Sequence, residues 1–219
     1  MIEYRLIRSD RRTLSISIDR EGALVVHAPK RVSRQAIETF ILQKQEWIRS
    51  HRKAVLAAKA QIPQLTEGSV IPFWGRTLTI TFRDVLQAVH QSGMLCLPKV
   101  ADPLLHARKW RLLQAAALVT PRVESWAQAT GLRPLQTAYG SARTRWGSMN
   151  VTTRSLRLNA ALIHLPQELV DYVIVHELVH LVHPNHSPAF HAEVRRMLPD
   201  ADRRRNALKG YAYLLQMWQ

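Results

Sequence analysis

The sequence DYVIVHELVHLVHPNHSPAFH occupies residues 171–191 and predicts a helix that is buried nearly all round, because few polar residues interrupt its apolar ones. On an α-helix, residues four apart lie about 40° apart around the axis, so His176 and His180 present two imidazoles side by side. Burying these imidazoles and the carboxylate of Glu177 without a partner costs roughly several kcal/mol. A metal ion would compensate all three groups directly.

A third ligand follows the predicted helix. Pro184 lacks a backbone donor and disfavours helix at His183, so the helix is expected to end there and the chain to turn back. This turn makes His186 available to the metal. Zinc bound by three neutral imidazoles keeps a fourth position for water, and Glu177 can take the proton of that water. The spacing therefore predicts one zinc ion (Zn2+) per chain, bound by His176, His180 and His186.

Other interpretations of these histidines stay open. At this chain's composition the His-Glu-x-x-His pattern arises by chance at a rate of roughly 2%, and the competing structure is a helix of packed, hydrogen-bonded histidines. His183 lies one helical turn beyond His180, but Pro184 distorts its backbone, so contact with a substrate or transition state fits it better than ligation. Ligation by His183 in place of His186 is the alternative, and His191 is interpreted as a surface histidine.

The first hundred residues show period-two alternation, which predicts a β-rich region with one docking helix. Ser33 can cap that helix, and its apolar positions from Ile37 to Ile48 fall on one face. The predicted strands are a hairpin of residues 14–18 and 23–28, a strand over 78–82, and a pair over 85–90 and 94–97.

From Pro103 the pattern turns helical, and Pro121 is expected to open a second helical piece that stops at Gly131. Short strands are predicted over 137–139 and 156–159, before the histidine-bearing helix. The sequence therefore predicts an α+β fold with two domains. Residues 1–100 form the β-rich region, and residues 101–219 form a mainly helical region with a short sheet.

The charge of the chain is strongly positive, with 31 Lys and Arg against 16 Asp and Glu and a formal net charge of +15. Such a charge raises the encounter rate with anionic partners such as nucleic acid or nucleotides. A solvated basic surface is the alternative interpretation. The predicted contacts for weak nucleic-acid or phosphate binding are Arg195, Arg196, Arg203, Arg204 and Arg205.

Cysteine content and hydropathy indicate the compartment. The single cysteine, Cys96, permits no intramolecular disulfide, which fits a reducing environment. The first ten residues lack the apolar core of a secretory signal. The longest apolar stretch, residues 169–182, carries four ionisable residues and is too short to cross a bilayer. We expect a cytoplasmic protein with no membrane span.

Three further motifs carry a family resemblance. RWGS at 145–148, LRLN at 156–159 and NHSPAF at 185–190, together with HELVH at 176–180, resemble the YgjP-type metallopeptidase-domain family, which is related to SprT-like zinc proteases. The resemblance implies a zincin-like metallohydrolase domain in the C-terminal part, with protein or peptide substrates. It also implies zinc on His176, His180 and His186, with Glu177 as general base. Family members often carry a cysteine after Trp-Gly-Ser, and Met149 at this position argues against an essential thiol.

Arg145 is a further candidate site residue. An arginine beside Trp146 and a Gly-Ser turn can project into a cleft, where it would neutralise a developing oxyanion or hold a substrate anion. The alternative is a tryptophan packed under the sheet with Arg145 stacked on it.

Three functions follow from these residues. The leading hypothesis is a zinc metallopeptidase in which zinc polarises the scissile carbonyl and Glu177 moves the proton of water to the leaving amine. One alternative is a metal-dependent nucleoside triphosphate pyrophosphatase or phosphohydrolase, which the positive charge would help. A second is a zinc-stabilised nucleic-acid-binding module, in which Glu177 would have no task. The chain shows no P-loop, Rossmann glycine motif or helix-turn-helix signature.

Overall fold

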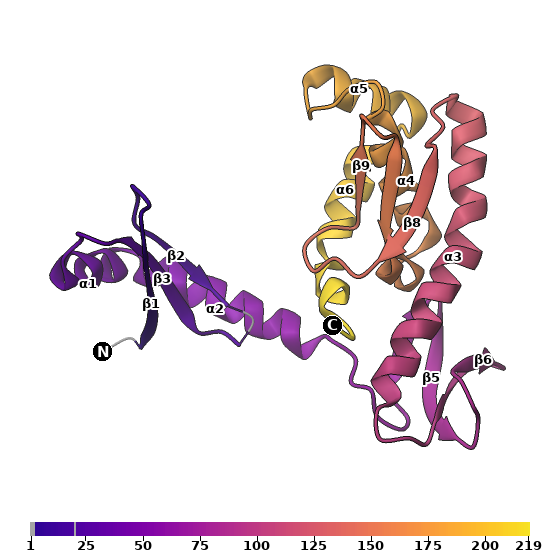
Figure 1. Cartoon of the computed structure of the whole chain (residues 1–219), viewed down its shortest axis with the longest axis horizontal. Coiled ribbons are helices and arrows are strands. Elements are labelled where there is room, and N and C mark those ends of the chain that lie inside the picture. The colour runs from indigo at the N-terminus through magenta and orange to yellow at the C-terminus, as the bar shows by residue number, and fades with distance from the viewer. Residues whose placement is uncertain (1–2, 20) are drawn as a thin grey trace. The chain divides into compact units, whose positions relative to one another are not determined.

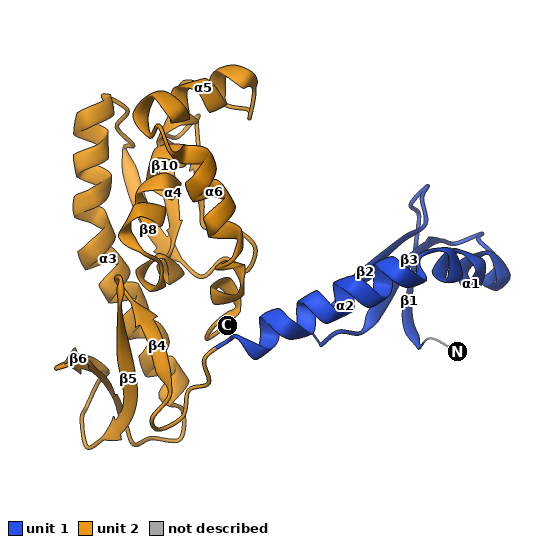
Figure 2. Cartoon of the chain, turned by 180° about the vertical axis from the view of Figure 1, so that it is seen from behind, with its two compact units in different colours: residues 1–62 blue, residues 63–219 orange. Residues whose placement is uncertain are grey.

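The computed structural model describes residues 3–19 and 21–219, and the chain divides into two compact units (Figure 2). Unit 1 comprises residues 1–62, and unit 2 comprises residues 63–219. Together they mix helices and strands, which confirms the predicted α+β class.

Unit 1 is a three-stranded sheet with two helices (Figure 1). Its elements are β1 (Tyr4–Ser9), β2 (Ser15–Ile18), β3 (Leu24–Pro29), α1 (Arg34–Gln43) and α2 (Gln45–Ala60). The predicted hairpin is confirmed, because β2 pairs antiparallel with β3. Strand β1, which the sequence did not predict, pairs parallel with the other edge of β3. Alternation along β3 sends Leu24, Val26 and Ala28 into a core shared with the helices.

Helix α1 begins where its sequence predicts. The hydroxyl oxygen of Ser33 accepts a hydrogen bond from the backbone N–H of Ala36 at 3.2 Å, and this contact satisfies one of the free donors at the helix start. The predicted single helix is nevertheless two helices, because the backbone leaves helical geometry at Lys44 (φ −101°, ψ 11°). The break lets Ile41 of α1 and Ile48 of α2 reach the same core.

Unit 2 contains two sheets. The first has the order β4-β5-β7-β6, with β5 and β7 parallel and both outer pairs antiparallel. The second has the order β8-β10-β9, with β8 parallel and β9 antiparallel to β10. The strands are β4 (Val70–Phe73), β5 (Arg76–Arg83), β6 (Val89–Gln91), β7 (Met94–Pro98), β8 (Gln136–Gly140), β9 (Gly147–Asn150) and β10 (Ser155–Asn159).

One long helix, α3 (Pro103–Thr130), contacts both sheets of unit 2 (Figure 1). Its ends follow the sequence, since Asp102 caps the first turn and Gly131 ends the helix in the left-handed conformation (φ 72°). The expectation that Pro121 opens a separate helical piece is wrong, because α3 is continuous. Pro121 is exposed, so water can hydrate the carbonyl it leaves unpaired, while Val119 and Val123 stay buried on the opposite face.

The remaining elements complete unit 2 around the second sheet. They are η1 (Ala160–His164), α4 (Gln167–Val179), α5 (Pro188–Met197), α6 (Ala201–Lys209) and η2 (Ala212–Gln216). Helix α4 packs against α3, α5, α6 and β9, so it lies at the centre of this part of the fold.

The compact units divide at residues 62 and 63, whereas the sequence predicted regions of 1–100 and 101–219. The difference arises because β4 contacts η1 and β7 contacts α3, which joins the first sheet to the helical part. Alternation along the chain marks these residues as strands but does not show which helix covers them. A functional division near residue 100 stays a prediction.

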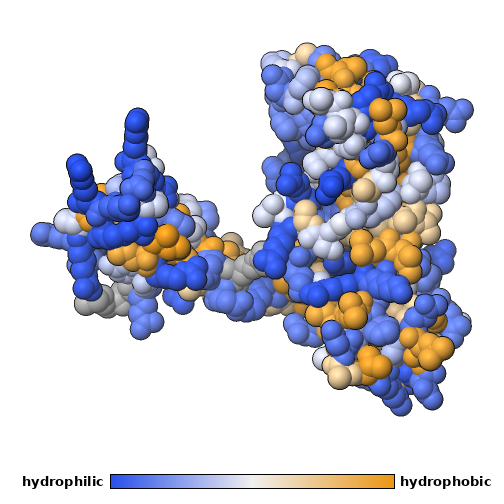
Figure 3. All heavy atoms as spheres, viewed as in Figure 1, coloured by the Kyte–Doolittle hydropathy of each residue, from blue (hydrophilic) through white to orange (hydrophobic). Residues whose placement is uncertain are grey.

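Most side chains on the face shown in Figure 3 are hydrophilic. On the face shown in Figure 3, hydrophobic side chains occur in several separate groups rather than one large patch. Within the described residues, no helix is both long enough and apolar enough to span a membrane.

Candidate metal centre and cleft

Helix α4 positions two histidines and a glutamate. It starts after Pro166, and from Leu169 to Val179 almost every residue is buried, as the apolar sequence predicts. His176 and Glu177 lie in its last turn, and His180 caps its C-terminal end. The buried helix therefore holds these three side chains on a rigid element.

The helix ends one turn before the position that Pro184 predicts. Its last helical residue is Val179, and the backbone N–H groups of Leu181 and Val182 donate to carbonyls three residues back. Hydrogen bonds to carbonyls three residues back make the last turn tighter than an α-helix, and they satisfy carbonyls that the helix end would leave unpaired. The loop that follows turns back and brings His186 beside His176, as the sequence predicted.

The nitrogens of His176, His180 and His186 converge, and the three candidate ligand atoms all lie within 4.8 Å of one another. The Nε2 atoms of His176 and His186 are 3.1 Å apart. Zinc–nitrogen bonds of about 2.0–2.1 Å in a tetrahedron place two ligand nitrogens about 3.3 Å apart. The spacing of His176 and His186 therefore suits two ligands of one metal ion, and His180 lies close enough to be the candidate third ligand.

Hydrogen bonding and burial prepare these imidazoles as ligands. The Nδ1–H of His180 donates to the carbonyl of His183 at 3.1 Å, which leaves Nε2 free to ligate. Burial, and then the neighbouring His180 and His186, lowers the pKa of His176 to about 3. Burial also lowers the pKa of His180. Both rings are thus neutral at physiological pH, as metal ligation requires.

Phe190 packs against all three imidazoles of the histidine cluster. It is fully buried in α5, and its ring centroid lies 4.9, 4.6 and 4.8 Å from those of His176, His180 and His186. Ser187 fixes the start of α5 by accepting a hydrogen bond from the backbone N–H of Phe190 at 3.3 Å. The segment after His186 therefore places a buried aromatic ring against which all three imidazoles pack.

Glu177 points toward β9 rather than into the histidine cluster. Its carboxyl lies against Gly147 and accepts a hydrogen bond from the backbone N–H of Met149. Burial raises its pKa to about 7, and the Met149 bond and the charge of Arg145 oppose that rise. The side chain is buried yet lines the same cavity as the histidines.

A cavity of about 740 Å³ is lined by the three histidines and Glu177. Residues 144–149, which lead into and include part of β9, form another part of its lining. Helix α4 and its C-terminal end contribute Tyr172, Val173, His176, Glu177 and His180 to the lining. Arg205, Leu208 and Lys209 of α6 line it together with Ala212 and Leu215 of η2. The candidate metal centre therefore lies in an open cleft rather than in the protein core.

The predicted substrate contacts differ in where they lie. Arg145 lines the cavity, and among the described residues no carboxylate lies within ion-pair distance of its guanidinium. Its backbone carbonyl accepts a hydrogen bond from the Nδ2 amide of Asn159 at 3.0 Å. His183 does not line the cavity. Its backbone carbonyl accepts the hydrogen bond from Nδ1 of His180. His191, interpreted as a surface histidine, does line the cavity.

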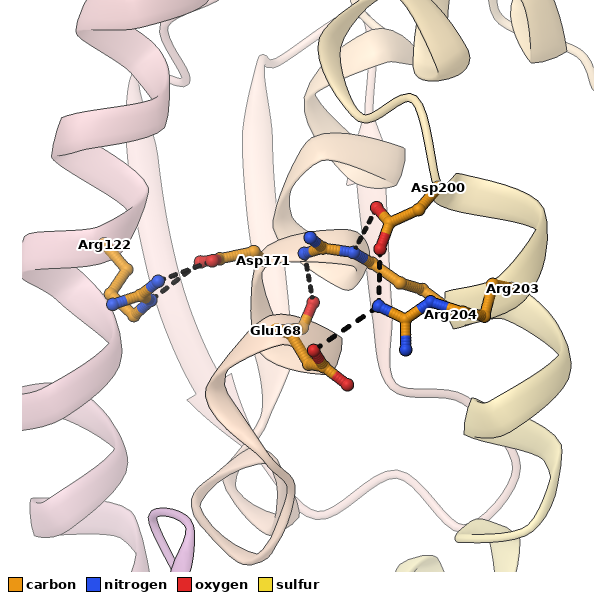
Figure 4. A network of polar contacts seen from close by, with 6 residues as sticks. All are labelled: Arg122, Glu168, Asp171, Asp200, Arg203 and Arg204. Atoms are coloured by element: carbon orange, nitrogen blue, oxygen red, sulfur yellow. Dashed lines mark hydrogen bonds and ion pairs between the residues drawn. The ribbon is translucent and has the colours of Figure 1, made fainter.

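The five arginines predicted to contact nucleic acid all carry ion pairs. Arg203 and Arg204 bind Asp200 at 2.6 and 2.7 Å, and Arg203 also reaches Glu168 at 3.5 Å (Figure 4). Asp202 pairs with Arg195 and Arg205, and Glu193 pairs with Arg196. Of the five, only Arg205 lines the cavity. Nucleic-acid contact through this cluster stays a prediction.

Another ion pair in Figure 4 anchors α4 itself. Arg122 of α3 binds both carboxylate oxygens of Asp171, at 2.7 and 2.5 Å. The pair is largely buried, with 12% of the Asp171 side chain exposed. It fixes α4 against α3 five residues before the first metal-ligand candidate.

No curated protein is significantly similar to the chain. The crystal structure of the metallopeptidase zymogen of Pyrococcus abyssi abylysin is 20% identical, with a TM-score of 0.40, over 43% of this chain and 94% of that one. That of Methanocaldococcus jannaschii jannalysin is 21% identical, with a TM-score of 0.39, over 42% and 95%.

The sequence profile described as YgjP-like, metallopeptidase domain, matches residues 12–211, which is most of the chain. This match confirms the resemblance carried by the Trp-Gly-Ser and histidine motifs. The chain belongs to the YgjP-like metallopeptidase-domain family and is a metallohydrolase of the peptidase type.

Proposed function

We propose that this metallopeptidase uses zinc, held by His176, His180 and His186, and that Glu177 is its general base. The observation that carries the proposal is the convergence of three imidazoles and a buried carboxyl in one open cavity. A zinc ion in such a site supplies a Lewis acid that polarises a carbonyl and lowers the pKa of water.

Glu177 has the placement that a general base needs. Its carboxyl lines the cavity beside His176 but is held away from the ligand cluster by its contact with β9. One carboxylate oxygen would accept the proton of the attacking water, and the resulting carboxylic acid would donate that proton to the nitrogen of the leaving amine. Arg145 would stabilise negative charge that develops on the substrate oxygen.

The edge strand β9 favours a peptide as substrate. It pairs with β10 on one side only, and three of its residues, from Gly147 to Met149, line the cavity. An extended peptide can add to such an edge through backbone hydrogen bonds, which position it without requiring a particular sequence. An unfolded protein segment would therefore lie along β9 and across the metal centre.

The cations of the cavity favour a second candidate, hydrolysis of a nucleoside triphosphate. Arg145, Arg205 and Lys209 line the cleft, and cationic side chains attract and orient phosphates. Such a substrate would leave the edge strand without a role.

One assay distinguishes these candidates. The full chain is stripped with a chelator, reloaded with one equivalent of zinc, and incubated in parallel with an unfolded protein and with nucleoside triphosphates. We expect cleavage of the unfolded protein only after zinc is restored. Release of phosphate or pyrophosphate without peptide cleavage would reject the peptidase and establish the second candidate.

A further inference from the structure

The wall of the cavity that is formed by α4, α6 and η2 has a mixed chemical character. Val173 lies one helical turn before His176 and is almost completely buried, as is Leu215 of η2. Leu208 of α6 is half-buried beside them. These aliphatic side chains form an apolar surface next to the metal centre, on which the methylene groups of a substrate side chain could pack.

Two cationic side chains, Arg205 and Lys209, line this same wall. Arg205 and Lys209 are four residues apart in α6, so they lie on one face of the helix, and both are exposed. Among the described residues that line the cavity, Glu177 is the only carboxylate. The apolar surface is thus bordered by positive charge.

This positive charge is not cancelled by its neighbours. Arg205 pairs with Asp202 at 3.0 Å, but Asp202 lies outside the cavity lining and also pairs with Arg195. Among residues 3–19 and 21–219, Lys209 donates only to the neutral side-chain amide of Asn206, at 2.9 Å. A guanidinium and an ammonium therefore remain available to an anion in the cleft.

We propose that this wall is a subsite for a substrate side chain with an aliphatic stem and a terminal carboxylate, above all glutamate. The stem would pack on Val173, Leu208 and Leu215, and the carboxylate would bind Arg205 and Lys209. Lysine and arginine side chains would be repelled by like charge. The inference rests on the proposed peptidase function, since it assigns the specificity of the same cleft.

Binding to an inactive variant tests the subsite without turnover. Short capped alanine peptides that differ only in a central Glu, Gln, Lys or Leu are titrated into the zinc-loaded Glu177→Gln variant by calorimetry. We expect the Glu peptide to bind about tenfold more tightly than the Gln peptide, because a charge-assisted hydrogen bond replaces a neutral one. The Lys peptide should bind most weakly.

Two further variants in the same background assign the effect. Arg205→Gln and Lys209→Gln together should reduce the preference for Glu over Gln to nearly none. Arg76→Gln is the matched control, because Arg76 is exposed at the start of β5 and does not line the cavity. It should leave the preference unchanged.

Three outcomes would overturn the subsite. They are equal binding of the Glu and Gln peptides, a preference that survives the combined Arg205→Gln and Lys209→Gln substitutions, and no binding by any peptide at millimolar concentration. Failure of the peptidase function looks different. In that case the Glu preference persists in the binding experiment, but the zinc-loaded wild-type chain cleaves none of the peptides.

Discussion

A Cβ atom added at Gly147 would lie 2.8 Å from Cγ of Glu177 and 2.9 Å from its Oε1, so the Glu177 carboxyl occupies the space that any other side chain would take. Two residues along the same strand, the backbone N–H of Met149 donates a hydrogen bond to this carboxyl. Strand β9 therefore fixes the general-base candidate by one missing side chain and one backbone donor. This is a physical reason for glycine in the Arg-Trp-Gly-Ser motif.

Gly147→Ala should displace the Glu177 carboxyl and lower peptidase activity. Because the loss is that of a general base, we expect the rate to fall by about 10²-fold to 10⁴-fold. Zinc content should stay at one ion per chain, since the three atoms nearest the added methyl group all belong to Glu177 and not to a histidine. Gly140→Ala, at the end of β8, is the control, because a Cβ there meets no atom within 4 Å. Unchanged activity in Gly147→Ala would show that Glu177 can move without cost.

Glu177→Gln should abolish hydrolysis while zinc remains bound. The amide has nearly the same shape as the carboxylate but cannot accept the proton of the attacking water, so the rate should again fall by about 10²-fold to 10⁴-fold. Steady-state kinetics on a peptide and metal analysis of the same sample measure both effects. Wild-type turnover in this variant would mean that another group activates the water.

His186→Ala should weaken zinc binding. Loss of a residue that only orients a ligand costs about 10-fold to 100-fold in affinity, so loss of a ligand should cost more than about 100-fold. Competition with a chromophoric chelator gives the affinity. His191→Ala is the matched control, since His191 stacks on His186 with ring centroids 6.3 Å apart but is not among the converging ligands. If the two variants bind zinc equally well, the third ligand is not His186.

The histidine cluster could be predicted from the sequence because its geometry is local. The spacing of His176 and His180 fixes their relation on any helix, and Pro184 ensures that the chain leaves the helix before His186. The position of the helix end could not be predicted to the residue. It depends on the bond between His180 and the carbonyl of His183 and on shorter-range bonds in the last turn.

The rest of the cleft depends on contacts between distant parts of the chain. Tyr172 and Val173 could have been found by counting one turn back from His176. No local pattern shows that Leu208 and Leu215 come to the same cavity, because the packing of α6 and η2 brings them there. Strand β9 was also missed, since Gly-Ser-Met-Asn lacks the alternation that marks a half-buried strand.

His164 should make unit 2 less stable in acid. Its ring is buried, and its Nδ1–H donates to the carbonyl of Pro72 at 2.6 Å, while Nε2 has no partner among the described residues. Burial, with a further contribution from the charge of Arg111, lowers its pKa from 6.5 to about 3. Between these values the unfolded chain binds a proton that the folded chain does not, so the free energy of unfolding falls as the pH falls.

The change attributable to His164 between pH 7 and pH 5 should be about 2 kcal/mol, because the unfolded histidine gains most of its proton in that interval. His164→Asn removes the titrating ring but keeps an amide N–H that can reach the Pro72 carbonyl. Other buried histidines of unit 2, such as His176, titrate in both proteins, so their contribution cancels in the comparison. Urea unfolding of the two full chains at both pH values gives the difference directly. Parallel losses of stability in wild type and variant would mean that His164 is not held neutral by its burial, and a smaller loss in the variant would establish that it is.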